Sequence, residues 1–75
     1  MNINPIENIG TNAGIVWRTL HNSERDLSLQ ELTQATGLDI IHVAAAIGWL
    51  ARENKIVITP DADGAVFHVY KECYF

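Results

Sequence analysis

The residues best suited to chemistry are few and poorly spaced for it. His21, His42, His68 and the single cysteine, Cys73, are the only soft metal ligands in the chain. Structural zinc sites use closely spaced pairs such as Cys-x2-Cys or His-x3-His, and no such pair occurs. His68 and Cys73 lie five positions apart in a strand-like segment, which directs them to opposite faces. The sequence therefore predicts no metal site, and a lone cysteine near a strand end is typical of a small half-buried residue rather than a nucleophile.

Two other patterns resemble ligand sites but lack essential parts. Asp61 and Asp63 are typical of a turn, and the segment around them lacks the remaining oxygen ligands of a calcium loop. The segment 10–14 contains glycines, but no strand precedes it and no lysine follows, so it does not match a phosphate-binding loop. His42 has no obvious charged partner, which argues against a pH switch there. We expect a protein without enzymatic activity and without a cofactor.

Length and composition favour one small folded domain that covers residues 1–75. The chain has 75 residues, a formal net charge of −4, 48% hydrophobic residues and 19% charged residues. No segment has the roughly 18 consecutive apolar residues of a membrane span, and the first residues do not resemble a secretory signal. A single cysteine cannot form an internal disulfide. These features predict a cytoplasmic protein with no membrane association.

Capping residues and apolar periodicity predict three helices. Asn4 and Pro5 mark the start of the first helix, which ends near residue 22. Ser28 and Glu31 have the spacing of a capping box at the start of a short second helix. One face of the first helix carries apolar residues at helical spacing: Ile6, Ile9, Ala13, Val16, Trp17 and Leu20.

The second and third helices are predicted to be separated by a tight turn. Gly37 is typical of a left-handed helix end, and Asp39 then caps a third helix over about residues 40–53. On that helix Ile40, Val43, Ile47 and Leu50 share one face. We expect the core to contain nine residues: Val16, Trp17, Leu20, Leu32, Val43, Ile47, Leu50, Ile56 and Phe67.

A β-hairpin is predicted after the third helix, because the apolar period changes from 3.6 to 2. Residues 55–59 form the first strand, residues 60–64 a turn in which Gly64 has positive φ, and residues 65–75 the second strand. Leu27 and Ser28 could add a short third strand. Both faces of the second strand carry aromatic side chains, so its end either folds back over Trp17 or Trp49 or is covered by a second subunit.

This order of elements is that of an α+β winged helix-turn-helix domain, with three helices followed by a C-terminal β-hairpin wing. The resemblance rests on the segment 32–39, with its glycine in the turn, and on apolar positions further along: Val43, Ala46, Ile47, Leu50 and Ile56. Thr33 departs from the small alanine that such domains usually carry there. The segments 14–17 and 46–53 resemble more narrowly a family of small, free-standing bacterial winged-helix proteins. That resemblance implies the fold and assigns no activity.

The outward face of the third helix is the candidate binding surface. Ile41, Ala45 and Gly48 form an apolar strip bordered by Trp49, and these four residues are the predicted protein interface. A glycine inside a helix costs about 1 kcal/mol relative to alanine, and close approach of another backbone is one use for it. Gly10 and Gly14 form a second notch, and weak helix termini or packing within the monomer explain these glycines equally well. The favoured hypothesis is a non-catalytic protein-binding module that forms a homodimer.

DNA binding is the alternative hypothesis, since the third helix of such domains lies in the major groove. The net charge of −4, the acidic Asp39 and the acidic turn disfavour it, because phosphate contacts supply most of the non-specific affinity. Few side chains on the outer face can read base edges. Under this hypothesis the groove contacts are Ile41, His42, Ala45 and Arg52, with Lys55 on a phosphate.

Overall fold

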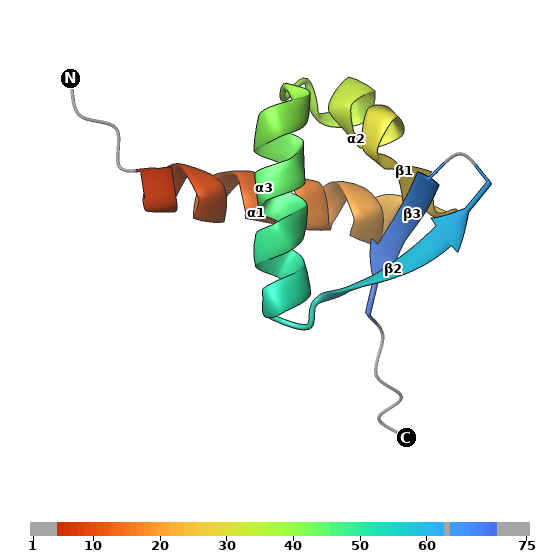
Figure 1. The fold of residues 1–75 in the computed structure, drawn as a ribbon. Helices are drawn as coiled ribbons and strands as arrows, with labels where there is room; N and C mark the ends of the chain where they lie inside the picture. Colours follow the sequence, from red (N-terminus) through yellow and green to blue (C-terminus); the bar gives the residue numbers. More distant parts are fainter. Residues whose placement is uncertain (1–4, 63, 71–75) are drawn as a thin grey trace.

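The chain folds into three helices and a three-stranded antiparallel sheet, which confirms the predicted α+β winged helix-turn-helix architecture (Figure 1). The computed structural model describes residues 5–62 and 64–70. The elements follow in the order α1 (Pro5–Asn22), β1 (Leu27–Ser28), α2 (Leu29–Thr36), α3 (Ile40–Arg52), β2 (Ile56–Asp61) and β3 (Gly64–Val69). In Figure 1 α3 crosses α1, and the sheet lies at the C-terminal end of α1.

Local signals set both boundaries of α2. The Ser28 Oγ accepts a hydrogen bond from the Glu31 backbone N–H at 3.1 Å, and the Glu31 carboxylate accepts one from the Ser28 N–H at 2.9 Å. This reciprocal pair is the predicted capping box. At the other end Gly37 has φ of 77°, and its N–H donates to the Thr33 carbonyl at 3.0 Å. The predicted left-handed end at Gly37 is therefore confirmed.

The turn after α2 sets the direction of α3. Three residues, 37–39, connect the two helices, which meet at 111°. Asp39 caps α3 as predicted, accepting a hydrogen bond from the His42 N–H at 2.9 Å. Among the described residues no single helix is long and apolar enough to cross a membrane, and α2 and α3 reach that composition only as a bent pair.

The sheet has the order β1-β3-β2, so β3 lies between a two-residue strand and the longer β2. The predicted short strand at Leu27 and Ser28 is confirmed, and Leu27 pairs with Phe67. The predicted turn over residues 60–64 was wrong at both of its ends. Pairing continues to Pro60 and Asp61, which the sequence assigned to the turn, because the register brings Asp61 opposite Gly64. The strand predicted over 65–75 covers Gly64–Val69, and residues 71–75 lie outside the described residues, as does the predicted cap Asn4.

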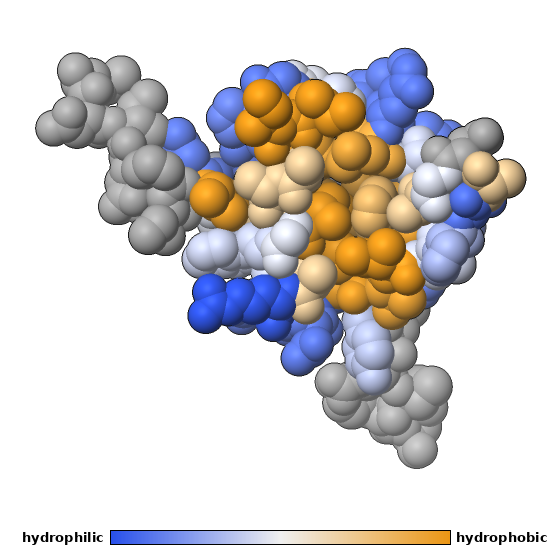
Figure 2. Space-filling model, in the orientation of Figure 1, coloured by the Kyte–Doolittle hydropathy of each residue, from blue (hydrophilic) through white to orange (hydrophobic). Residues whose placement is uncertain are grey.

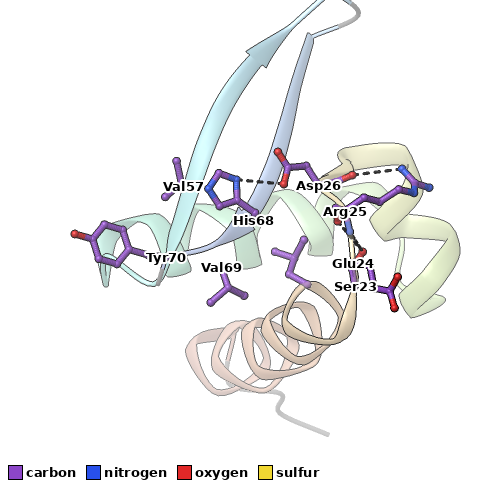
Figure 3. A pocket seen from close by; sticks show the side chains of 9 residues that line it. Ser23, Glu24, Arg25, Asp26, Val57, His68, Val69 and Tyr70 are labelled. Carbon is purple, nitrogen blue, oxygen red and sulfur yellow. Dashed lines mark hydrogen bonds and ion pairs between the residues drawn. The ribbon is translucent and has the colours of Figure 1, made fainter. Parts of the chain in front are cut away.

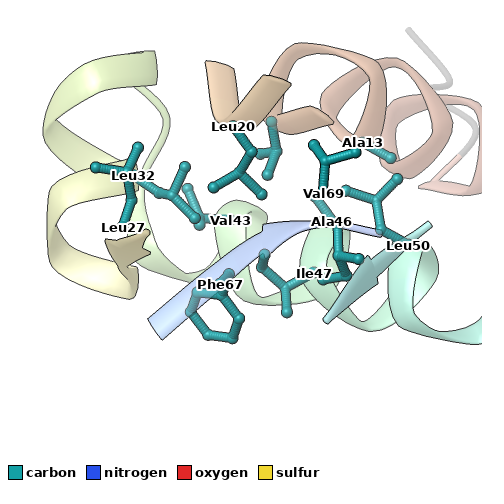
Figure 4. Close-up of a cluster of buried hydrophobic side chains, with 12 residues drawn as sticks. Ala13, Leu20, Leu27, Leu32, Val43, Ala46, Ile47, Leu50, Phe67 and Val69 are labelled. Atoms are coloured by element: carbon teal, nitrogen blue, oxygen red, sulfur yellow. The ribbon is translucent and has the colours of Figure 1, made fainter. Parts of the chain in front are cut away.

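The core lies between α1, α3 and the inner face of the sheet (Figure 4). Eight of the nine predicted core residues are buried, and the ninth, Trp17, is only half-buried. The Trp17 ring instead stacks on His21 at the surface of α1, with ring centroids 4.7 Å apart. The first buried side chain described on α1 is Ala13, eight residues after the helix begins. The complete set of buried apolar residues is Ala13, Val16, Leu20, Leu27, Leu32, Val43, Ala46, Ile47, Leu50, Ile56, Phe67 and Val69.

Ile40 was wrongly predicted to share the buried face of α3. Its side chain is 53% exposed. The residue is the first of α3, where the helix leaves the core beside α2. There it lines an open groove of about 680 Å³ together with Leu29 of α2 and Phe67 of β3. A helical projection shows which residues share a face of the helix. It does not show how far along the helix the neighbouring elements cover that face.

Candidate functional site

The outward face of α3 is apolar over most of its length. Ile41 is 74% exposed, Gly48 is exposed, and Ala45 is half-buried between them. Trp49 is half-buried and packs against the core at the side of this strip. The structure thus brings the four predicted interface residues together on one helix. Figure 2 shows apolar surface that starts over the N-terminal half of α3 and continues toward the sheet, with strongly hydrophilic surface at the C-terminal end of the helix.

Gly48 has no evident role in packing of the monomer. Apart from its chain neighbours and the backbone of its own helical turns, a Cβ atom placed at Gly48 has no atom of the described residues within 4 Å, and the residue keeps ordinary helical backbone angles. The same test at Gly10 also finds open space, and at Gly14 it finds only the Arg18 Nη1 atom at 3.8 Å. None of these glycines accommodates a tightly packed neighbour, so the packing explanation that the sequence left open finds no support among the described residues.

Three further apolar residues, which the sequence did not assign to the surface, are exposed. Ile40 is 53% exposed, Ala44 is exposed, and Ile58 on β2 is 48% exposed. Ile58 lies opposite the buried Phe67 and so on the core-facing side of the sheet, beyond the part that α3 covers. Its exposure depends on the length of β2 relative to α3, for which the sequence contains no signal.

The N-terminal end of α3 carries a pair of side chains that the sequence did not predict. The His42 Nδ1 atom lies 2.6 Å from the Asp39 Oδ1 atom, so His42 has a charged partner and the contrary prediction was wrong. The backbone N–H of His42 and then its side chain hold the pKa of Asp39 below its ordinary value. The i, i+3 spacing inside the cap was the available signal. In helix-turn-helix domains that bind DNA, this end of the recognition helix approaches the bases.

The basic residues are distributed over different elements. Arg25 lies in the α1–β1 loop, with its Nη2 atom 2.5 Å from the Glu31 Oε2 atom. Arg52 is exposed in the last turn of α3, Lys55 is exposed just before β2, and Arg18 is exposed on α1. The ion pair neutralises one of the few cations that phosphate binding requires.

An open pocket of about 400 Å³ lies between the α1–β1 loop and the outer face of the sheet (Figure 3). Asp26 comes from the loop and His68 from β3, and the Asp26 Oδ1 atom lies 3.5 Å from the His68 Nδ1 atom. Val57 and Tyr70 line the sheet side of the pocket. No hydroxyl or thiol of the described residues is hydrogen-bonded to His68, so the pocket lacks a nucleophile–base pair.

Metal ligands do not cluster in the part of the chain that the structure describes. No group of three or more His, Cys, Asp or Glu side chains there is arranged to hold a metal ion. Cys73 lies outside this part. The surface that the structure does assemble is the apolar face of α3.

Comparison with known proteins agrees with the fold. Residues 4–71 match the family model described as winged helix-turn-helix domain (DUF2582). An uncharacterised protein of Methanocaldococcus jannaschii, MJ1608, is 39% identical over 54 residues, which are 71% of this chain and 77% of that protein.

Two solved structures have the same arrangement of elements. The solution structure of protein BT2368 from Bacteroides thetaiotaomicron superposes with a TM-score of 0.77 at 37% identity, covering 88% of this chain and 79% of that one. The Helicobacter pylori ferric uptake regulator Fur, whose structure reveals three functional metal-binding sites, superposes with a TM-score of 0.74 at 20% identity. That superposition covers 85% of this chain and 47% of the regulator. At this identity the likeness to Fur concerns the fold alone.

Proposed function

Because the chain belongs to the DUF2582 family of winged helix-turn-helix domains, α3 occupies the place of a recognition helix, and we propose that it contacts protein instead of DNA. In this proposal the protein is a non-catalytic binding module, and its partner at α3 is a second copy of the same chain. The contact residues are Ile41, Ala45, Gly48 and Trp49.

The open space beside Gly48 is the observation that carries the proposal. A glycine inside a helix destabilises it by about 0.5–1 kcal/mol relative to alanine. Since a Cβ at this position meets no described atom within 4 Å outside its own stretch of α3, packing against the rest of the described monomer does not require a glycine there. A glycine at this position lets the backbone of a second helix approach α3 closely, which explains why the helix carries a glycine there.

The chemistry of the strip supports a second copy as the partner. Ile41, Ala45 and Gly48 are uncharged and lie at i, i+4 and i+7 spacing along one side of α3. Two such strips can pack around a two-fold axis without placing like charges in contact. Symmetric pairing of this kind is the commonest form of soluble oligomer. Arg52, one turn beyond Gly48, lies at the end of the contact, where its guanidinium keeps access to water.

Substitution of Gly48 tests the interface. Gly48→Leu fills the space across which the helices approach and is expected to convert a dimer into a monomer at micromolar concentration, as measured by sedimentation equilibrium. Gln34→Leu adds the same side chain to an exposed position of α2 and serves as the matched control. Gly48→Ala separates association from folding, because it should stabilise the monomer by about 0.5–1 kcal/mol while weakening the dimer. A dimer mass unchanged by Gly48→Leu would refute the assignment of the interface.

A DNA titration tests the alternative function. Random-sequence duplex DNA is added at low salt to isotope-labelled protein, a condition that favours even weak phosphate contacts. The proposal expects no salt-sensitive amide shifts along α3 and the hairpin. Shifts confined to these elements, and abolished by Arg52→Ala, would instead establish DNA binding through Ile41, His42, Ala45, Arg52 and Lys55.

A further inference from the structure

Hydrogen-bonded and non-hydrogen-bonded residue pairs alternate along the hairpin, and this alternation determines which backbone groups of β2 point away from β3. The Tyr70 N–H donates to the Lys55 carbonyl at 2.9 Å, so the opposed residues Lys55 and Tyr70 form a hydrogen-bonded pair. Bonded and non-bonded pairs alternate along an antiparallel ladder. Val57 and Thr59 therefore bond to β3 like Lys55, whereas Ile56, Ile58 and Pro60 direct their backbone groups outward.

The outward side of β2 is a free edge of the described sheet. The strand order β1-β3-β2 places no described strand beside it. The N–H groups of Ile56 and Ile58 and the carbonyl groups of Ile56, Ile58 and Pro60 point toward this edge. Pro60 lies at an outward position, where its missing N–H removes no bond to β3. Edge strands with unpaired groups of this kind act as templates for another extended chain.

The side chains of β2 define what kind of chain fits. Lys55 precedes the strand and Asp61 ends it, and both are exposed. Between them lies the β-branched segment 56–59, in which Ile58 is 48% exposed on the core-facing side. An antiparallel chain along this edge begins opposite Asp61 and ends opposite Lys55. Charge complementarity therefore selects a segment that is basic at its start, apolar in its middle and acidic at its end.

We propose that the β2 edge binds an extended peptide segment of this charge order from another protein, as an added fourth strand. Main-chain hydrogen bonds supply the affinity, and one apolar side chain against Ile58 supplies selectivity. The peptide donates N–H groups to the carbonyls of Ile56, Ile58 and Pro60, and its carbonyls accept from the N–H groups of Ile56 and Ile58. This surface is separate from the strip at Gly48, so the two proposals are tested independently.

The test uses the full chain and one defined probe, the acetylated and amidated peptide Arg-Thr-Val-Ile-Val-Thr-Glu. On titration, the amide protons of Ile56 and Ile58 should move downfield as they gain acceptors. Those of Val57 and Thr59, which already bond to β3, should move less. A control peptide that is N-methylated at its central isoleucine cannot donate to the Ile58 carbonyl and should bind at least tenfold more weakly.

A matched pair of variants separates the contribution of the Ile58 backbone N–H from that of the Ile58 side chain. Ile58→Pro removes the outward N–H without removing a bond to β3, whereas Ile58→Thr also truncates the side chain but keeps the N–H. The proline variant should bind the probe about tenfold more weakly than the threonine variant, as expected for one lost hydrogen bond. The hairpin amide shifts of both variants check that the sheet is retained.

Three results would overturn the proposal. The first is equal binding of the methylated and unmethylated peptides. The second is a set of shifts that lies away from β2. The third is a concentration-dependent downfield position of the Ile56 and Ile58 amides in the free protein, which would show that a second copy already occupies the edge.

Discussion

Glu31 connects three parts of the chain through its two carboxylate oxygens. One oxygen accepts the Ser28 N–H at 2.9 Å and the other contacts the Arg25 guanidinium. The hydrogen bond from Arg25, followed by the one from the Ser28 backbone, lowers the pKa of Glu31 from 4.5 to about 2. A group at the surface thus ties the α1–β1 loop to the start of α2.

The depressed pKa of Glu31 predicts acid sensitivity at the start of α2. The stabilisation is complete above the unfolded-state pKa of 4.5 and is lost as the pH falls toward the folded-state pKa of about 2. The lowered pKa of Asp39 acts in the same direction. In urea titrations, the free energy of unfolding should therefore decrease between pH 4.5 and pH 2. Glu31→Gln keeps a capping amide but does not titrate, so a decrease as steep as in the parent protein would contradict the assignment.

At the scale of elements, the turn between α2 and α3 depends on a single backbone conformation. Gly37 adopts φ of 77°, and its N–H closes α2 on the Thr33 carbonyl. This conformation is unfavourable for residues with a Cβ atom. The turn sets the 111° angle between the helices and thereby the direction of α3.

Replacement of Gly37 should weaken the fold by a strain mechanism. Gly37→Ala is expected to reduce the free energy of unfolding by about 1 kcal/mol, since a left-handed residue with a Cβ costs that much. Gly37→Asn should lose less, because asparagine tolerates this region better. Urea denaturation of the two variants measures the difference. Equal losses would indicate that a side chain at this position clashes, although the surroundings of Gly37 are open among the described residues.

The sequence correctly predicted features that depend on neighbouring residues, and it missed features that depend on elements distant along the chain. Ser28, Gly37 and Asp39 were assigned correctly because a cap depends on residues three or four positions away. The exposure of Ile40 and the extension of β2 through Pro60 depend on elements distant in the sequence, and the apolar pattern carries no information about where those elements end. For the candidate surfaces, periodicity identified the strip on α3. The free edge required the order and register of the strands.

At the scale of the molecule, the core is small, so a few buried side chains contribute much of the free energy of unfolding. Leu32, Val16 and Val43 are the largest side chains that are fully buried. A domain of this length has a free energy of unfolding of roughly 4–11 kcal/mol, at 0.05–0.15 kcal/mol per residue. One cavity in the core therefore removes a large share of the total.

Truncation of a core leucine tests this concentration of stability. Leu32→Ala is expected to destabilise the protein by about 2–5 kcal/mol, enough to unfold a substantial fraction at 37 °C. Leu29→Ala truncates a half-buried neighbour on the same helix and should have a smaller effect. Thermal denaturation followed by circular dichroism measures both variants. Similar losses for the two would show that α2 is held by its caps more than by the core.

The position of the first buried residue on α1 has a consequence for local opening. The helix begins at Pro5 and has 18 residues, a length of about 27 Å, but residues 8–12, just before the buried Ala13, are exposed or half-buried. Short helical segments with little packing are only marginally stable in water. Opening around Gly10 therefore requires far less free energy than opening around Val16. The molecule has a graded stability along α1, and a protease should cut it near Gly10 while the winged-helix core remains folded.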